Sequence, residues 1–351
     1  MSVIRQDPTT KEWVIMAIER SKRPYEFKQA GASAPVAVHE AACPFCPGNE
    51  ALTPPEVYRF GRSASAGWSV RVMPNKFAAL TAKGNSIRRE VGPLFREMSG
   101  VGAHEVIVET PVHNRPIALM DDEEVEQILA AYQARYLALR DDPNIRYIII
   151  FKNYGEGAGT SLEHPHSQLV ATPVAPMQIR RKYDVAIGHY DDTGHCLYCD
   201  LVDEELRAGS RVIEETARFV VMHPFASRLP FETWILPKRH QPSFGQVPRE
   251  DLAELARVLK HSLRTLYTAL GNPEFNYIIH SAPVEGESAS YYLWHIQILP
   301  RLAMIAGFEL GSGIAINTVL PEESAEFIRR FNSDMLGKAD IRRLKGASTH
   351  S

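Results

Sequence analysis

The sequence is poor in the features that mark secreted, membrane-bound and nucleic-acid-binding proteins. It has 4 cysteines in 351 residues, too few for a disulfide framework in a chain of this size. No apolar run reaches the ~20 residues that a membrane-spanning helix needs, and the polar N-terminus lacks the apolar core of a signal peptide. The formal net charge of −3 gives no general attraction to nucleic acid or to an anionic membrane. We therefore expect a cytoplasmic enzyme or binding protein.

The few cysteines that are present form two close pairs. Cys43 and Cys46 lie in C-P-F-C, and Cys196 and Cys199 lie in C-L-Y-C. A CxxC pair indicates a zinc site, or thiol redox chemistry where it opens a helix that lowers a thiol pKa. Neither pair is predicted to open a helix, so the zinc interpretation is favoured over redox chemistry. A histidine follows each pair at the same place in a repeated pattern, which favours zinc over free buried cysteines.

One pattern occurs twice along the chain. Each copy has strands that end near a histidine, then an amphipathic helix, an apolar strand and a second extended segment. The predicted helices are residues 121–140 and 249–270, the apolar strands 142–151 and 272–281, and the last segments HPHSQLVATP and LWHIQILPR. The spacing is nearly constant, since His113 and His240 are 127 residues apart and His166 and His295 are 129 apart.

This repeat predicts an α+β fold made of two tandem duplicated modules. Each module is expected to be an antiparallel sheet with helices packed on it. We place the first module at residues 1–178 and the second at 190–345, with the join near the polar stretch 176–194.

Two histidines flank a proline in the stretch SLEHPHSQLV, residues 161–170. Proline fixes its own φ and favours an extended conformation for the residue before it, so H-P-H is not helical. Alternate side chains of an extended segment share a face. His164, His166 and Gln168 are therefore expected to line one side of a strand.

The repeat brings the cysteine pairs and the histidines together as two Cys2His2 sets. Thiolates and neutral imidazoles suit Zn²⁺, and four protein ligands close a structural site. The first set is Cys43, Cys46, His113 and either His164 or His166; the second is Cys196, Cys199, His240 and His295. The second copy has Leu293 where the first has His164, so the two sites cannot have identical geometry. Two Zn²⁺ per chain are expected, and iron at the second site is not excluded.

Several segments together resemble one enzyme family. They are RQDPTTKEWVIMAIERSKRP, CPFCPGNE, VRVMPNKF, ETPVH, NYGEGAGTSLEHPHSQ and RLAMIAGFELGSG. Over nearly its whole length the chain resembles the galactose-1-phosphate uridylyltransferase family of the histidine-triad superfamily. The resemblance implies that the two modules are histidine-triad-like.

The resemblance also implies a reaction. A nucleotidyltransferase of this kind moves a uridylyl group between UDP-glucose and galactose 1-phosphate, in ping-pong fashion, through a covalent nucleotidyl-histidine. His166 is then the nucleophile and His164 the fourth ligand of the first zinc. Imidazole suits this role because it is a good nucleophile toward phosphorus and, once phosphorylated, a good leaving group.

Further site residues follow from the matched motifs. Gln168 would hold the transferred phosphoryl group, and the glycine-bearing loop 155–159 would let backbone approach phosphate oxygens. The resemblance assigns phosphate contacts to Ser161, Asn153, Arg20 and Arg23, and the nucleoside pocket to Asn75 and Phe77. It implies a homodimer in which the segment near Phe308 reaches the partner's active site.

Three departures from the family pattern leave the base and the acceptor open. Ser167 follows the nucleophile where the family usually has glycine, Lys76 stands where an aspartate is common, and the late segment lacks a glutamine expected to hold the hexose. Relatives with HPHSQ include enzymes that act on ADP-glucose with phosphate as acceptor. The alternatives are therefore an ADP-glucose phosphorylase-type adenylyltransferase and, outside enzymes, a nucleotide-binding or zinc-stabilised scaffold.

Overall fold

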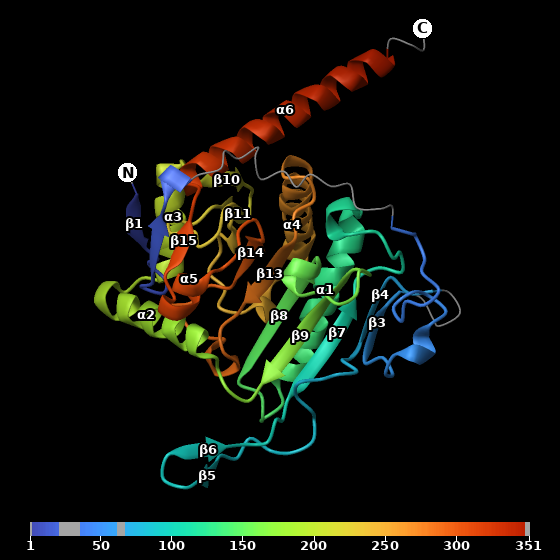
Figure 1. The fold of residues 1–351 in the computed structure, drawn as a ribbon, viewed down its shortest axis with the longest axis vertical. Helices are drawn as coiled ribbons and strands as arrows, with labels where there is room; N and C mark the ends of the chain where they lie inside the picture. The colour runs from blue at the N-terminus through green and yellow to red at the C-terminus, as the bar shows by residue number, and fades with distance from the viewer. Residues whose placement is uncertain (1, 21–35, 62–66, 348–351) are drawn as a thin grey trace.

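The structure, a computed structural model, describes residues 2–20, 36–61 and 67–347. In this part of the chain, helices pack on a large sheet of ten strands (Figure 1). Every pair of neighbouring strands in the sheet runs antiparallel. The predicted α+β fold on an antiparallel sheet is confirmed, but the sheets of the two copies are joined into one.

The two halves of this sheet have equivalent strand orders when each half is followed from its outer edge to the centre. In space the strands are β10 (Val212–Glu215), β11 (Phe219–Met222), β12 (Thr233–Pro237), β14 (His295–Pro300), β13 (Phe275–His280), β8 (Tyr147–Tyr154), β9 (His166–Thr172), β7 (Ala103–Val108), β4 (Val70–Pro74) and β3 (Tyr58–Phe60). The predicted apolar strands of the two copies, β8 and β13, pair at the centre. This symmetry agrees with a tandem duplication; the module boundaries at 178 and 190 stay a prediction.

Two long helices cover one face of the sheet, as the repeat predicts. They are α1 (Asp122–Arg140) and α4 (Arg249–Ala269), within one residue of the expected ends. A capping box begins α1, where the backbone N–H of Asp121 donates to Glu124 at 2.8 Å. In the residues described, no helix combines the length and the apolar character that crossing a bilayer requires.

The alternation of side chains along the strands separates the core from the site. On β9, Leu169 and Ala171 face α1 and α4 and belong to the main apolar core. His166 and Gln168 therefore lie on the opposite face of the sheet. Since a one-residue change of register would reverse these faces, burial of the core side chains also fixes where the histidine points.

The join between the copies is a helix, which the sequence analysis did not predict. Helix α2 (Met177–Thr193) begins after Pro176 and ends at Gly194, whose φ is +76°. A proline at the start and a glycine just past the end are a known helix signature, so the signal was present in the polar stretch. Lys182 on α2 is buried against the second half of the sheet.

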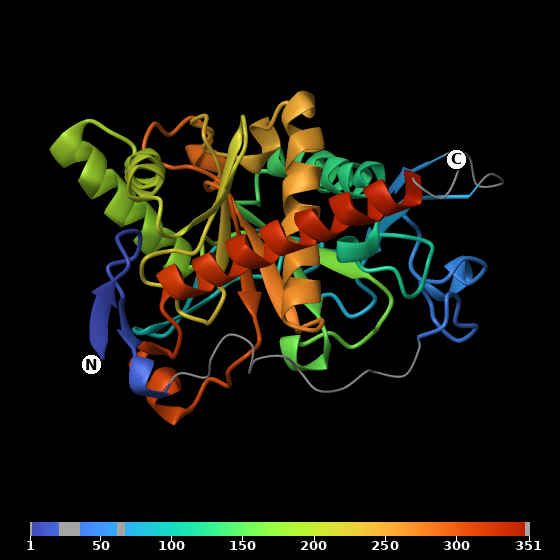
Figure 2. The same cartoon turned by 90° about the horizontal axis from the view of Figure 1, so that it is seen from above.

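Further strands and helices lie outside the large sheet and its two covering helices. They are β1 (Val3–Gln6), β2 (Trp13–Met16) and β15 (Ala315–Asn317) in a three-stranded sheet, the hairpin β5 (Arg89–Val91) and β6 (Phe95–Glu97), and the helices α3 (Leu197–Ala208), α5 (Gly307–Ser312) and α6 (Pro321–Ala347). The hairpin projects from the body of the molecule (Figure 1), and α6 runs across α4 (Figure 2).

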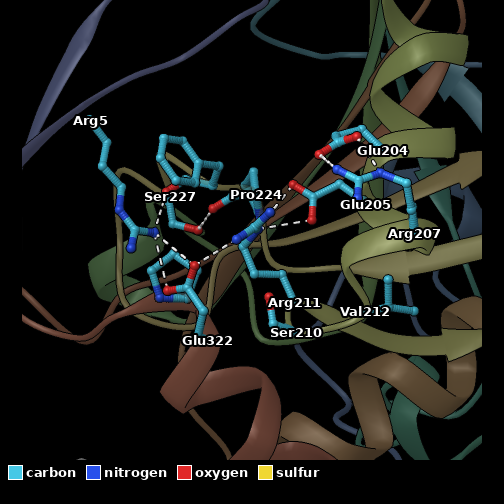
Figure 3. Close-up of polar contacts among 12 residues, drawn as sticks. Arg5, Glu204, Glu205, Arg207, Ser210, Arg211, Val212, Pro224, Ser227 and Glu322 are labelled. Carbon is cyan, nitrogen blue, oxygen red and sulfur yellow. Dashed lines mark hydrogen bonds and ion pairs between the residues drawn. The ribbon is translucent and has the colours of Figure 1, made fainter.

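The N-terminal strands are attached to the second half of the molecule. Strand β2 pairs in parallel with β15. Arg5 on β1 lies 3.1 Å from Glu322, Glu322 lies 2.7 Å from Arg211, and Arg211 lies 2.9 Å from Glu205 of α3 (Figure 3). These contacts connect β1, α3 and the start of α6. A network of partly buried charges stabilises a fold more than isolated surface pairs do.

Gly102 is required at the start of β7 by both its conformation and its surroundings. Its φ is +150°, and a Cβ would lie 2.2 Å from the carbonyl oxygen of Ala171. We expect Gly102→Ala to lower the free energy of unfolding by about 3 kcal/mol, because backbone rather than a flexible side chain must move. The matched control is Gly92→Ala in the projecting hairpin, where φ is +78° but no atom lies within 4 Å; about 1 kcal/mol is expected there. Equal losses in urea denaturation would contradict the close-approach argument.

Candidate functional site

The first Cys/His group is assembled from four separate places in the chain. Cys43 and Cys46 come from the loop before β3, His113 follows β7, and His164 precedes β9. Their ligand atoms lie within 4.8 Å of one another, and all four residues are buried. The predicted choice between the HPH histidines is decided in favour of His164, whose Nδ1 lies 3.7 Å from Cys43 Sγ and 3.6 Å from Cys46 Sγ.

The geometry of this group fits a tetrahedral metal ion such as zinc. With Zn–S of about 2.3 Å and Zn–N of about 2.0 Å, a tetrahedral site separates sulfur from nitrogen by about 3.5 Å. The observed Cys46 Sγ to His113 Nδ1 distance is 3.4 Å. His164 Nε2–H donates to the Thr110 carbonyl at 2.8 Å, which leaves the lone pair on Nδ1, facing the thiols. Burial also lowers the pKa of His164 to about 4, so the ring is neutral, as a metal ligand must be.

A second Cys/His group lies at the start of α3. It contains Cys196, Cys199 and His240, with His240 Nδ1 3.4 Å from Cys199 Sγ. The expectation that neither CxxC pair opens a helix is wrong here, since Cys196 is the N-cap of α3. A hydrogen bond from the Cys199 thiol lowers the pKa of Cys196 to about 5, which favours the thiolate that binds a metal.

His295 is not part of this second group, and its prediction as the fourth ligand is not supported. Its Nδ1 lies 3.1 Å from the carbonyl of Leu293 and its Nε2 lies 3.4 Å from Lys182 Nζ. The ring is fully buried and stacks on Trp234 at 4.8 Å. The physical reason is position: the counterpart of the ligand His164 is Leu293, which offers no ligand atom. His295 is instead the counterpart of His166.

His166 begins β9 beside the first group and is held in one tautomer. Its Nδ1 lies 2.8 Å from the carbonyl oxygen of His164. Because a carbonyl only accepts, Nδ1 carries the proton and the lone pair of the neutral ring is on Nε2. Burial lowers the pKa of His166 below its ordinary value, which favours this neutral form. An imidazole with a lone pair on Nε2 is the form that can attack an electrophilic phosphorus.

Gln168 lies two residues further along the same face and is fixed by a histidine that sequence reasoning missed. The backbone N–H of Ala79 donates to His104 Nδ1 at 3.1 Å, so His104 Nε2–H donates to Gln168 Oε1 at 2.7 Å. Asn75 Nδ2 also donates to this oxygen at 3.4 Å. With Oε1 accepting from two groups, the amide NH2 of Gln168 remains to donate to a substrate oxygen. The alternation of HEVIVE in β7, which puts His104 on the face of Gln168, was the available signal.

Asn153 links the glycine-bearing loop to the second half of the molecule. It donates to the Gly159 carbonyl at 3.4 Å and accepts from Asn276 of β13 at 2.8 Å. In the loop, the N–H of Gly157 donates to the Glu274 carboxylate at 3.1 Å. This N–H therefore meets a carboxylate of the same chain, and the predicted phosphate contact of the loop stays a prediction.

The structure places three of the remaining predicted site residues at exposed positions. Ser161 is exposed in the loop before β9, and Phe77, after β4, has an exposed fraction of 86%. Phe308 lies on α5 with an exposed fraction of 52%. Arg20 ends a short 3₁₀ turn, and Arg23 lies outside the described residues. Their proposed roles all concern a substrate or a partner subunit.

Comparison with known proteins agrees with this arrangement. A family model described as the N-terminal domain of galactose-1-phosphate uridyl transferase matches residues 1–176, and a domain of unknown function, DUF4921, matches 118–341. ADP-glucose phosphorylase of Arabidopsis thaliana is 36% identical, covering 93% of this chain and 92% of the relative. Galactose-1-phosphate uridylyltransferase of Thermotoga maritima is 30% identical, covering 94% and 98%. The chain belongs to the galactose-1-phosphate uridylyltransferase family, a family of nucleotidyltransferases.

Solved structures give the same result at the level of the fold. The crystal structure of the Arabidopsis thaliana ADP-glucose phosphorylase with bound ADP-glucose has a TM-score of 0.79 and 32% identity, covering 94% of this chain and 99% of that one. A uridylyltransferase structure has a TM-score of 0.74 and 28% identity, covering 96% and 100%. The resemblance noted in the sequence is therefore confirmed over almost the full length.

Proposed function

We propose that this protein transfers a nucleotidyl group from a nucleotide sugar to an acceptor phosphate, either a sugar 1-phosphate or inorganic phosphate, through a covalent intermediate on His166. The observation that carries the proposal is the state of this side chain. It is a neutral imidazole with its proton on Nδ1 toward the His164 carbonyl, at the start of a strand whose next residue on that face is Gln168. The substrate pair we propose first is UDP-glucose and galactose 1-phosphate, on the strength of the family.

The chemistry follows from the groups on this face of the sheet. Nε2 of His166 would attack the α-phosphorus and displace the sugar 1-phosphate, forming a P–N bond as a P–O bond breaks. The amide NH2 of Gln168 would donate to a phosphoryl oxygen as charge develops there. A phosphate oxygen of the acceptor would then attack the same phosphorus, forming a P–O bond as the P–N bond to His166 breaks. Ser161, Asn153, Arg20 and Arg23 are proposed phosphate contacts, and Asn75 and Phe77 the nucleoside side.

The metal has a structural role in this proposal. Cys43, Cys46, His113 and His164 would hold Zn²⁺, and the chemistry it supplies is ligation that fixes the N-terminal loop and the strand preceding His166. A second Zn²⁺ or iron would be held by Cys196, Cys199 and His240. We further propose a cytoplasmic homodimer, in which the exposed Phe308 segment extends toward the partner's site.

A second candidate substrate pair is ADP-glucose and inorganic phosphate. It is favoured by the 36% identity to an ADP-glucose phosphorylase over 93% of the chain, compared with 30% for a uridylyltransferase over 94%. Both candidates use the same first half of the reaction, so they differ only in the base bound and in the acceptor.

Label exchange separates the two candidates. Purified protein is incubated with UDP-glucose or ADP-glucose, each with labelled glucose 1-phosphate, and label entering the nucleotide sugar is measured. We expect exchange with one nucleotide sugar to exceed the other by at least about 100-fold, since a site that hydrogen-bonds one base leaves polar groups unpaired with the other. Release of ADP with phosphate identifies the phosphorylase; formation of UDP-galactose from galactose 1-phosphate identifies the uridylyltransferase. Absence of exchange with both would refute the proposed function.

A further inference from the structure

A buried polar network lies directly behind His166, on the helix-covered face of the sheet. The register between β8 and β9 runs from Tyr147↔Thr172 to Phe151↔Gln168. His166 lies beyond the last of these pairs, so its carbonyl has no place in the ladder with β8. Strand β9 begins at His166, the proposed nucleophile, where it pairs with Val108 of β7.

A lysine side chain takes the place of the missing ladder bond. Lys152 Nζ donates to the carbonyl oxygen of His166 at 3.0 Å and to Glu109 Oε2 at 2.6 Å. The side chains of Lys152 and Glu109 have exposed fractions of 1% and 0%. On the other side of β9, the backbone N–H of Glu109 donates to the Pro165 carbonyl at 3.1 Å. Lys152 of the ion pair therefore holds the carbonyl of His166, and the backbone of Glu109 holds the preceding residue, Pro165.

Three hydroxyl groups extend this network into the second half of the molecule. The Ser167 hydroxyl contacts the Glu109 carboxylate and the hydroxyl of Tyr132 on α1. Tyr132 lies 2.5 Å from the hydroxyl of Tyr277 on β13, and Tyr277 lies 3.3 Å from Ser167. Burial raises the pKa of both tyrosines, so the hydroxyls keep their protons and can donate. The Ser167 side chain thus points away from the face of β9 that carries His166 and Gln168.

The energetics of such a pair argue against a purely stabilising role. Removing two charges from water costs several kcal/mol per ion, and apolar replacements of similar volume are often equally stable or more so. A buried lysine that donates to the backbone of the nucleophile makes a contact that an apolar pair could not provide. Placement of reacting atoms is sensitive, since a misplacement of about 1 Å can cost on the order of 100-fold in rate.

We propose that Lys152 and Glu109 are positioning residues for His166, with Ser167 joining them to Tyr277 of the second half. The inference rests on the proposed function, because it concerns the same nucleophile. Neither residue touches the substrate; they act by fixing the backbone from which the His166 ring projects. The consequence is that the transfer step depends on this ion pair while nucleotide-sugar binding does not.

The test is the double variant Lys152→Met with Glu109→Leu, measured in single turnover. We expect nucleotidyl transfer to His166 to slow by about 10- to 100-fold, while the dissociation constant for the nucleotide sugar stays within about threefold and the metal content is unchanged. The Tm is expected to stay close to that of the wild type, because both charges are removed together. If this variant does not fold, Lys152→Gln with Glu109→Gln replaces it, since the shorter amide cannot reach the His166 carbonyl.

The matched control is Arg135→Met with Glu105→Leu. These two residues form an ion pair of 2.7 Å between α1 and β7 on the same face, with exposed fractions of 13% and 6%. The Arg135 guanidinium donates to both oxygens of the Glu105 carboxylate, whereas Lys152 donates to a carbonyl of β9. The transfer rate of the control variant is expected to stay within about twofold of the wild type. An unchanged rate in the Lys152/Glu109 variant, or equal slowing in both variants, would overturn the positioning role. If the wild type itself forms no nucleotidyl-His166, the proposed function fails instead.

Discussion

Replacing His166 by glycine is expected to reduce nucleotidyl exchange by at least about 10⁴-fold. In a covalent mechanism the nucleophile cannot be bypassed, and removal of such a residue in other enzymes costs on the order of 10⁴ to 10⁶. The fold and the first metal group should remain, because the ligand at that group is His164. The measurement is exchange of labelled glucose 1-phosphate, together with the intact mass after incubation with nucleotide sugar. The wild type should gain one nucleotidyl group and the variant none.

The chain provides its own control in His295, the counterpart of His166 in the second half. Both rings have Nδ1 against the carbonyl two residues earlier. His295, however, is fully buried and its Nε2 faces Lys182. His295→Gln is therefore expected to keep exchange within about threefold, with a lower Tm as the cost of disturbing a buried contact. Undiminished exchange in His166→Gly would remove His166 as the nucleophile, and loss of exchange in His295→Gln would place chemistry in the second half.

Replacing Cys46 by serine is expected to remove one metal ion per chain and to lower the Tm by at least about 10 °C. All four residues of the first group are buried, so the uncoordinated polar groups that remain have no access to water. Structural zinc contributes on the order of 10 kcal/mol of apparent folding free energy in small domains, and about 1 kcal/mol corresponds to 2–4 °C in chains of 150–250 residues. Metal analysis and thermal unfolding measure the two quantities.

Cys199→Ser is the matched variant in the second group. Cys199 is partly exposed, and the described residues offer three ligands rather than four. We expect loss of one metal ion there too, but a decrease in Tm of less than half that of Cys46→Ser, because the group is less buried. Two metal ions per wild-type chain are expected, and His295→Gln should leave that number unchanged. Equal decreases in Tm for Cys46→Ser and Cys199→Ser would contradict the expectation that the first metal group stabilises the fold more than the second.

Local patterns in the sequence were sufficient for much of the fold. The apolar periodicity of 121–140 and 249–270 predicted α1 and α4, and the β-branched runs predicted β8 and β13, because these signals depend only on neighbouring residues. The helix α2 was missed although Pro176 and Gly194 mark its ends, since its composition is polar. Its reason to be a helix is the burial of Lys182 and its neighbours on the second half, which is a tertiary contact.

The repeat predicted the equivalence of His166 and His295 but not their different surroundings. Both begin a strand at the same place in their half. What separates them is that α2 and Trp234 cover His295, and no spacing along the chain reveals which strand end will be covered. The same holds for Lys152 and Glu109, which are 43 residues apart and read as ordinary charged residues in strands until the sheet brings them behind His166.

By itself the sequence determined which side chains share a face of a strand, because the alternation of His164, His166 and Gln168 follows from extended backbone after a proline. It also determined the duplication and the two CxxC pairs. The tertiary structure brought His164, the ligand that the family resemblance implied, to Cys43 and Cys46. It alone decided which of two equivalent histidines is enclosed and which residues lie behind the nucleophile. These are choices between groups far apart in the chain, and they are made by burial and by the sheet register, which bring such groups to within a few ångströms of each other.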